Sequence, residues 1–220
     1  MKKPGKHHPA LGVIILGAGD SVRMGRPKLL LPWGGISIIG HLISQWQALQ
    51  AEQIAVVLRP GDRPLNAELN RLGFSPADRI ENPDARRGMF SSIQCAANWD
   101  GWKENLNTWA VQLGDQPHLR LETLRALLAF HQENPDAVCQ PTHGGRARHP
   151  VLLPRAAFAG LRNTRAETLK EFLQQTSCRL AGHPLADAGL ALDLDHPQDY
   201  ERAVKFHQRN GSTTRSRKNG

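Results

Sequence analysis

The residue types best suited to chemistry stand in one stretch near the N-terminus. An apolar run at residues 13–16 is followed by a loop with three glycines, and the loop also carries Arg23 and Lys28. Glycines let the backbone approach a ligand closely, and successive N–H groups can point into one concavity that binds an anion. The planar fork of Arg23 and the point charge of Lys28 both complement phosphate oxygens. The stretch therefore predicts a binding site for a nucleoside triphosphate.

Two familiar phosphate-binding loops do not fit this stretch. A P-loop requires a Lys-Ser/Thr pair after a glycine, and none occurs here. A dinucleotide-binding Rossmann loop places its third glycine where this chain has Val22, and it expects an acidic residue after the second strand. The second predicted strand, residues 54–58, runs into Arg59 instead.

Residues 16–28 read Leu-x-Ala-Gly-x-Ser-x-Arg-Met-Gly-x-x-Lys. This pattern resembles the signature loop of nucleotidyltransferases, and it is most similar to the MobA/MocA-type enzymes of molybdenum cofactor synthesis. Gly17 stands where that family has Ala or Gly. The resemblance implies catalytic roles for Arg23 and Lys28, which would stabilise the leaving pyrophosphate. It also implies nucleotide contacts from Leu16, Gly17, Ala18, Gly19, Ser21, Arg23 and Lys28.

A second glycine-serine segment begins at Gly88 and opens a predicted helix that ends near Trp99. Free N–H groups and hydroxyls at a helix start suit capping and ligand binding equally. The family's Gly-Met/Leu-Ser-Ser-Ser stretch helps to hold the base and ribose, which implies the same for Gly88, Ser91 and Ser92. Phe90 replaces the first serine, so one hydroxyl contact is missing.

Asp115 follows the buried strand predicted at residues 108–113. Ligands of open α/β sheets bind beyond the carboxyl ends of strands, and a carboxylate there can hold Mg²⁺ together with phosphate oxygens. A purely structural Asp in the turn is the alternative. The Gly-Asp-Gln-Pro sequence resembles the MocA-like pattern, which favours the metal.

The sequence Asp-Leu-Asp at residues 193–195 resembles the family's Asp-Ile-Asp ending. We expect a strand over residues 190–195, whose alternation would place Asp193 and Asp195 on one face. Asp195 is the expected second metal ligand, with Asp193 in reserve. Asp199 is expected to serve the dipole of the following helix.

The segment from Gly144 to Pro154 resembles the family's acceptor-side sequence Gly-x-x-Gly-His-Pro-Val-Leu. His149 either binds the acceptor or, as a histidine before a proline, merely packs. Arg148 replaces the usual glycine, and it either changes the loop geometry or adds a cation near the acceptor phosphate.

The resemblance implies a single-domain three-layer α/β/α fold with a Rossmann-like, mostly parallel sheet, of the nucleotide-diphospho-sugar transferase type. The 220 residues, 40% of them hydrophobic, suit one such α/β domain. Apolar spacing predicts further elements. These are helices at 36–49, 64–72, 121–132, 166–174 and 197–206, and strands at 53–58, 79–82 and 137–141.

The net charge of +8 lies in the ends of the chain. Residues 1–10 carry three lysines and no acid, residues 205–220 carry five basic residues and no acid, and the remainder is neutral. We therefore expect a flexible N-terminus (1–10), a nucleotidyltransferase domain (11–206) and a disordered basic tail (207–220). Nucleic acid is not an expected partner.

Other features of the chain favour a cytoplasmic protein. It has no apolar run long enough to cross a bilayer, its start does not resemble a signal peptide, and its three cysteines are widely spaced and odd in number. The membrane is accordingly not an expected partner.

The resemblance implies Mg²⁺-dependent transfer of CMP from CTP to the terminal phosphate of molybdopterin, with release of pyrophosphate. Gly-Asp-Gln-Pro and the double serine are more similar to the cytidylyl branch than to the guanylyl branch, which uses GTP. A molybdoenzyme or its maturation factor is the implied protein partner. The alternatives are transfer to another phosphorylated acceptor, a nucleotide-binding module without catalysis, and a nucleic-acid binder that uses the basic ends.

Overall fold

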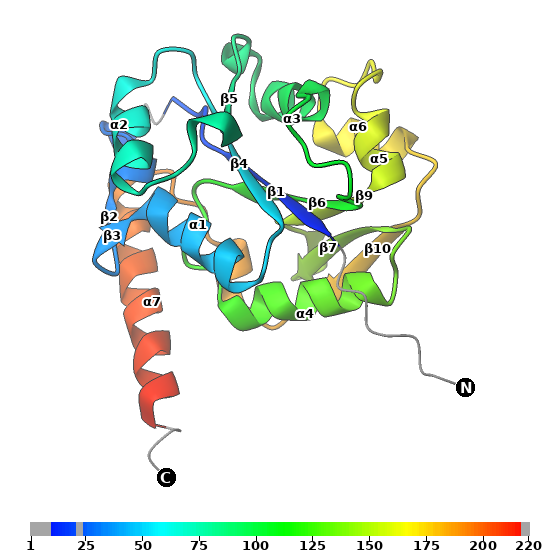
Figure 1. Ribbon diagram of the computed structural model, residues 1–220. Helices are drawn as coiled ribbons and strands as arrows, with labels where there is room; N and C mark the ends of the chain where they lie inside the picture. The colour runs from blue at the N-terminus through cyan, green and yellow to red at the C-terminus, as the bar shows by residue number, and fades with distance from the viewer. Residues whose placement is uncertain (1–9, 21–23, 217–220) are drawn as a thin grey trace.

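A computed structural model describes residues 10–20 and 24–216, with side chains up to residue 208. Its centre is an eight-stranded sheet in the order β10-β7-β9-β6-β1-β4-β5, with β8 paired to β7 (Figure 1). The pairs of β1 with β4 and β6, of β4 with β5, and of β7 with β10 are parallel, whereas β8 and β9 run antiparallel to their neighbours. The strands are β1 (Leu11–Leu16), β4 (Gln53–Leu58), β5 (Arg79–Glu81), β6 (Thr108–Leu113), β7 (Val138–His143), β8 (Arg146–Ala147), β9 (Val151–Pro154) and β10 (Leu180–Pro184).

Helices cover both faces of this sheet. One face packs against α1 (Ile38–Ala48), α2 (Arg63–Arg71), α4 (Leu121–Gln132) and α7 (Pro197–Ser216). The other face packs against α3 (Met89–Asn98), α5 (Arg155–Gly160) and α6 (Leu169–Gln175). Strand β1 supplies both cores, because Val13 and Ile15 face the first group and Ile14 faces the second. The expected three-layer α/β/α fold with a mostly parallel sheet is confirmed.

Several predicted elements have the observed bounds or nearly so, among them β4, β6 and α4. Helix α1 begins later than expected, since a hairpin of β2 (Pro32–Trp33) and β3 (Ile36–Ser37) precedes it and Ser37 caps it. Helix α6 likewise begins at Leu169, where the Thr168 hydroxyl accepts a hydrogen bond from the Glu171 N–H.

The strand expected at 190–195 is wrong. A 3₁₀ helix, η5 (Ala188–Ala191), stands at its start, and residues 192–195 form no regular element. The carboxylate of Asp187 accepts a hydrogen bond from the Gly189 N–H at 2.9 Å and stabilises the turn. The sheet instead contains β10, which pairs with β7 and was not expected from the sequence. The alternation argument for Asp193 and Asp195 therefore fails.

Helix α7 continues past Phe206 to Ser216, so its expected end is wrong. Asp199 lies at its start as expected, where a carboxylate oxygen accepts a hydrogen bond from the His196 N–H at 2.8 Å. The division of the chain into a domain and two basic ends stays a prediction.

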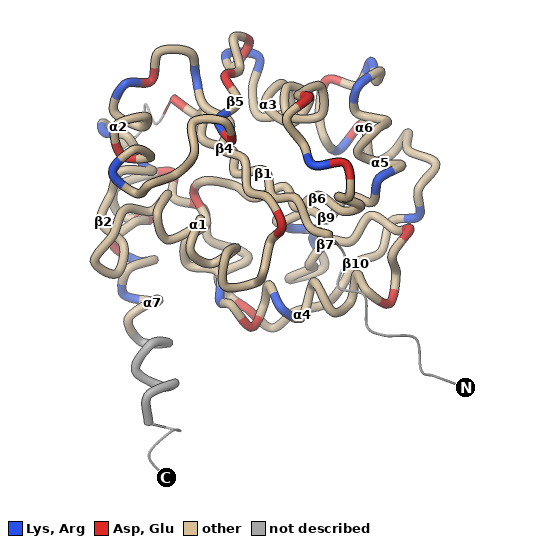
Figure 2. The backbone as a smooth tube through the Cα atoms, viewed as in Figure 1, with Lys and Arg blue, Asp and Glu red and all other residues tan. Residues whose placement is uncertain are grey.

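Acidic and basic residues are spread over the body without a face of one sign in this view (Figure 2). Among the described residues, no helix combines the length and apolarity required of a transmembrane segment.

Candidate active site at the carboxyl ends of β1 and β6

The two loops that build the site leave the sheet side by side. Strands β1 and β6 are parallel neighbours, and Leu16 pairs with Leu113 at their carboxyl ends. A Cβ atom on Gly114 would lie 2.6 Å from the Leu16 carbonyl oxygen, and one on Gly17 would lie 2.9 Å from that of Val57. Both positions therefore require glycine for this close approach.

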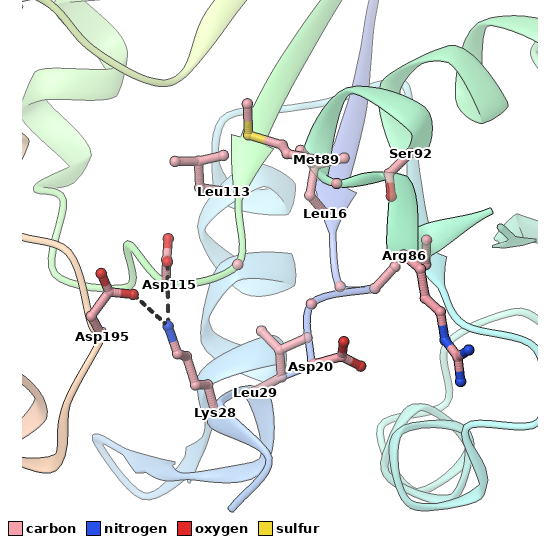
Figure 3. A pocket seen from close by; sticks show the side chains of 16 residues that line it. Leu16, Asp20, Lys28, Leu29, Arg86, Met89, Ser92, Leu113, Asp115 and Asp195 are labelled. Atoms are coloured by element: carbon pink, nitrogen blue, oxygen red, sulfur yellow. Dashed lines mark hydrogen bonds and ion pairs between the residues drawn. The ribbon is translucent and has the colours of Figure 1, made fainter. Parts of the chain in front are cut away.

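A cavity of about 500 Å³ opens between these loops and the start of α3 (Figure 3). It contains most of the predicted site residues: Leu16, Gly17, Ala18, Gly19, Lys28, Gly88, Ser92, Asp115 and Asp195. Ser91 and His149 do not line it. Ser21 and Arg23 lie outside the described residues.

Lys28 joins the two predicted metal ligands. It begins a 3₁₀ helix, η2 (Lys28–Leu30), and its ammonium lies 3.7 Å from a carboxylate oxygen of Asp115 and 3.2 Å from one of Asp195. Figure 3 shows both carboxylates on the same side of the cavity as Lys28. Residues from three distant parts of the chain thus meet at one point, as the sequence predicted.

The carboxylates of Asp115 and Asp195 both lie beside Lys28 in this corner of the cavity. Burial raises the pKa of Asp115, the ammonium of Lys28 opposes this rise, and the carboxylates of Asp193 and Asp195 add to it. A raised pKa means that the Asp115 carboxylate is held at an energetic cost, which a bound cation would relieve.

The donor set fits a hard divalent cation that is shared with a phosphate. Among the described residues, no group of three His, Cys, Asp or Glu side chains is placed to hold a metal. Mg²⁺ is commonly bound by one or two carboxylates together with substrate phosphates and water. Asp115 and Asp195 therefore suit Mg²⁺ in the presence of a nucleotide.

The side chain of Asp193 is engaged elsewhere. It accepts a hydrogen bond at 3.2 Å from the amide nitrogen of Gln116, the residue that follows Asp115. Asp195 alone of this pair contacts Lys28. This arrangement favours Asp195 over Asp193 as a ligand, although both roles stay predictions.

Ser91 and Ser92 differ in how they are used. Both hydroxyls are buried and accept hydrogen bonds from the amide of Asn82, at 3.0 Å and 2.9 Å. The Ser91 hydroxyl also donates to the backbone at the start of α3, to the carbonyls of Asp84 and Gly88. These contacts are structural but do not cap α3, whose start has no side-chain cap hydrogen bond. Ser92 lines the cavity, and a ligand contact from Ser91 stays a prediction.

His149 is not among the residues that line this cavity, and a ring nitrogen is 3.4 Å from the Val111 carbonyl oxygen. Burial lowers its pKa and favours the neutral ring. Its peptide bond to Pro150 is cis. This placement agrees with the packing alternative, and an acceptor contact stays a prediction.

Sequence analysis missed three charged residues near the loop. Arg86 lines the cavity on the side opposite Lys28 (Figure 3). Asp20 also lines it and forms an ion pair with Arg59, which in turn lies 3.8 Å from Asp62. The position of Arg59 directly after β4 was a usable signal, because that strand ends beside the glycine-rich loop.

Comparison with known proteins agrees with this geometry. The family model for the MobA-like NTP transferase domain matches residues 13–181, well over half of the chain. The molybdenum cofactor cytidylyltransferase of Escherichia coli K12 is 26% identical over 195 residues, which cover 87% of this chain and 94% of that protein. The bifunctional protein GlmU of Leifsonia xyli is 33% identical over 128 residues, but the match spans only 25% of its length.

Solved structures show the same fold. The crystal structure of Rv0371c from Mycobacterium tuberculosis superimposes with a TM-score of 0.71 at 18% identity and covers 90% of this chain and 99% of that one. A second structure of that protein, described as a complex with manganese, gives a TM-score of 0.63 at 18% identity over 89% of this chain and 98% of that one. The chain is a nucleotidyltransferase, and it belongs to the family of MobA-like NTP transferase domains.

Proposed function

We propose that this enzyme transfers CMP from CTP to the terminal phosphate of molybdopterin and releases pyrophosphate. The observation that carries the proposal is the meeting of Lys28, Asp115 and Asp195 beside the glycine-rich loop. The choice of CTP and molybdopterin is supported by the cytidylyltransferase of E. coli, whose match spans nearly its whole length.

The proposed reaction is an in-line displacement at phosphorus. An oxygen of the acceptor phosphate bonds to the α-phosphorus of CTP, the bond from that phosphorus to the bridging oxygen breaks, and pyrophosphate leaves. The acceptor phosphate is ionised at neutral pH, so no general base is needed. Catalysis then rests on positioning and on neutralising charge.

The residues around the glycine-rich loop suit this task. The Gly17 N–H donates to the Val57 carbonyl at 2.7 Å, so the backbone N–H groups of Ala18 and Gly19 are the ones that would bind phosphate oxygens. The ammonium of Lys28 would neutralise charge on the leaving pyrophosphate. Arg23, which lies outside the described residues, is proposed to assist Lys28. Ser92 and Gly88 would contact the nucleoside from the start of α3.

Asp115 and Asp195 are the residues that would hold Mg²⁺. When bound, Mg²⁺ neutralises developing charge on the phosphates. In this arrangement Lys28 exchanges its contacts with the two carboxylates for contacts with the triphosphate.

The proposal is tested by measuring pyrophosphate release with Mg²⁺ from CTP, GTP, ATP and UTP, each with and without molybdopterin. We expect release only with CTP plus molybdopterin, and release by Asp115→Asn about 10²–10³-fold slower. Preference for GTP would keep the chemistry and overturn the choice of base. Binding of nucleotide without release in any mixture would exclude molybdopterin as the acceptor.

The proposal extends to the cellular setting. A molybdoenzyme or its maturation factor would receive the product, and the cytoplasm is the proposed location. Co-purification of a molybdoenzyme with the tagged enzyme is the corresponding measurement, and its absence at saturating product would count against this partner.

A further inference from the structure

One buried histidine links the two segments that carry the carboxylates. His118 closes the turn that begins with Gly114 and Asp115, and it is 1% exposed. One of its ring nitrogens, Nε2, lies 2.9 Å from the carbonyl oxygen of Gly189 and 3.1 Å from that of Leu192. As an N–H donor, this nitrogen satisfies two carbonyls of the segment that leads to Asp195.

The segment at residues 187–195 depends on such contacts. It forms no strand, so no ladder of backbone hydrogen bonds aligns it with the sheet. Its first residue, Asp187, is 1% exposed and accepts hydrogen bonds from the Thr123 hydroxyl at 2.5 Å and from the Gly189 N–H at 2.9 Å. Side chains of α4 and of the 114–118 turn therefore hold the segment in place, together with the burial of its Leu190 and Leu194 in the core.

The 114–118 turn is thus connected to the 187–195 segment by three of its side chains. Asp115 and Asp195 share the ammonium of Lys28, Gln116 donates to Asp193, and His118 bonds two backbone carbonyls. The backbone contact differs from the other two because it fixes the path of the chain and not only the direction of one side chain.

We infer that His118 is a positioning residue, which sets the place of Asp195 opposite Asp115 through the Gly189 and Leu192 carbonyls. The inference rests on the proposed function, in which these carboxylates share a divalent cation. Groups that orient metal ligands through hydrogen bonds change metal affinity by about 10–100-fold when they are replaced.

A second buried histidine supplies a matched control. His131, on α4, is also 1% exposed, and its Nε2 lies 2.9 Å from the hydroxyl of Thr108. That contact joins α4 to the start of β6, at the opposite end of the strand from Asp115. Its loss should lower stability without moving either carboxylate.

The experiment compares His118→Phe, His118→Gln and His131→Phe by two readouts, neither of which is activity. The first is the affinity for Mn²⁺, measured by electron paramagnetic resonance with CTP and no acceptor. The second is hydrogen exchange of the Leu190 and Leu192 amides in the metal-free protein, since these amides donate within the segment, to Asp187 and Gly189.

We expect His118→Phe to weaken Mn²⁺ binding about tenfold and to speed exchange in residues 189–195. His118→Gln, whose amide nitrogen can reach the same carbonyls, should restore most of both. His131→Phe should leave the Mn²⁺ affinity unchanged while its Tm falls. If His118→Phe does not fold, Thr123→Val releases the segment at Asp187 and should change both readouts in the same direction.

Where the wild type binds Mn²⁺ more tightly than Asp115→Asn, a folded His118→Phe protein that binds Mn²⁺ like the wild type overturns the inference, whatever its exchange rates. Wild-type binding no tighter than that of Asp115→Asn overturns the metal role in the proposed function instead. Hydrogen exchange then decides the inference alone: faster exchange in 189–195 upholds it, and unchanged exchange overturns it.

Discussion

The 114–118 turn and the 187–195 segment each bring one carboxylate to Lys28, but they are held in different ways. The turn follows β6, whose pairing with β1 runs up to Leu113, so the position of Asp115 follows from the sheet. The segment has no strand partner and depends on side chains more than 60 residues away in the sequence. Backbone pairing fixes the first placement, whereas side-chain hydrogen bonds and the burial of Leu190 and Leu194 hold the second.

The largest effect on the transfer rate is expected from Asp115→Asn, in the 114–118 turn. The amide keeps the shape of the side chain but removes the charge that Lys28 and the metal would share. The transfer rate should fall by about 10²–10³-fold, the scale for removing one preorganised electrostatic group. Single-turnover measurement of CMP transfer checks this value.

An Asp115→Asn enzyme with more than a tenth of the wild-type rate would contradict the role of Asp115. Circular dichroism and Tm serve as controls, because the side chain is partly exposed and its replacement should leave the fold intact.

The next effect distinguishes the roles of Asp193 and Asp195, the two carboxylates of the 187–195 segment. Asp195→Asn removes the contact with Lys28 and should raise the Mg²⁺ concentration for half-maximal rate by about tenfold or more. Asp193→Asn keeps a partner for Gln116, because the amide oxygen can accept the same hydrogen bond. It should change that concentration less than threefold, and the reverse ranking would reassign the second ligand to Asp193.

The third effect tests the anchor of the segment by Asp187→Ala. This change leaves the Thr123 hydroxyl and the Gly189 N–H without their acceptor, and it should cost about 2 kcal/mol of unfolding free energy. Urea denaturation at pH 7 measures the loss. A loss below about 0.5 kcal/mol would mean that the segment is held by other contacts.

The same anchor has a defined pH dependence. Burial by itself would raise the pKa of Asp187, but the hydrogen bonds from Thr123 and Gly189 and the charge of Arg120 outweigh burial and lower it. A carboxyl with a depressed folded pKa stabilises the fold above its unfolded pKa and loses that contribution as pH falls through the folded pKa. The difference between wild type and Asp187→Ala should therefore shrink below about pH 4.

The same contrast explains what could be predicted from the sequence. Strands β1 and β6 are mostly apolar runs followed by glycine, so the loop, Asp115 and their common sheet edge follow from local pattern. Residues 190–195 alternate in the same manner as a strand, yet Asp187, Thr123 and His118 bend them into a 3₁₀ turn and an irregular path. Contacts between such distant residues leave no local signal in the sequence.

Ser91 illustrates the same limit on a smaller scale. Its type and spacing fit both a cap and a ligand contact. Asn82, on the loop after β5, donates to the hydroxyls of both Ser91 and Ser92. Ser91 differs because its hydroxyl also donates to the carbonyls of Asp84 and Gly88. The family pattern could not reveal those partners.

The smallest expected effect is on the pH dependence of stability, and it comes from His41, which contacts the 114–118 turn. His41 on α1 makes a hydrogen bond to the backbone of Pro117, which raises its pKa, but burial and the nearby His207 outweigh this and lower the pKa to about 4. His41 therefore takes up a proton near pH 6.5 in the unfolded chain but only near pH 4 in the folded chain. Because of this difference, the free energy of unfolding falls as the pH drops from about 6.5 toward 4.

Between pH 7 and pH 5.5 this linkage amounts to about 1 kcal/mol. His41→Asn provides the matched variant, since its amide can still donate to Pro117 and does not titrate. Urea unfolding at both pH values should show the loss in the wild type and about 1 kcal/mol less of it in the variant. An equal loss in both proteins would place the pH dependence elsewhere and would remove His41 from the support of the turn, because a ring that titrates normally is not held buried against Pro117.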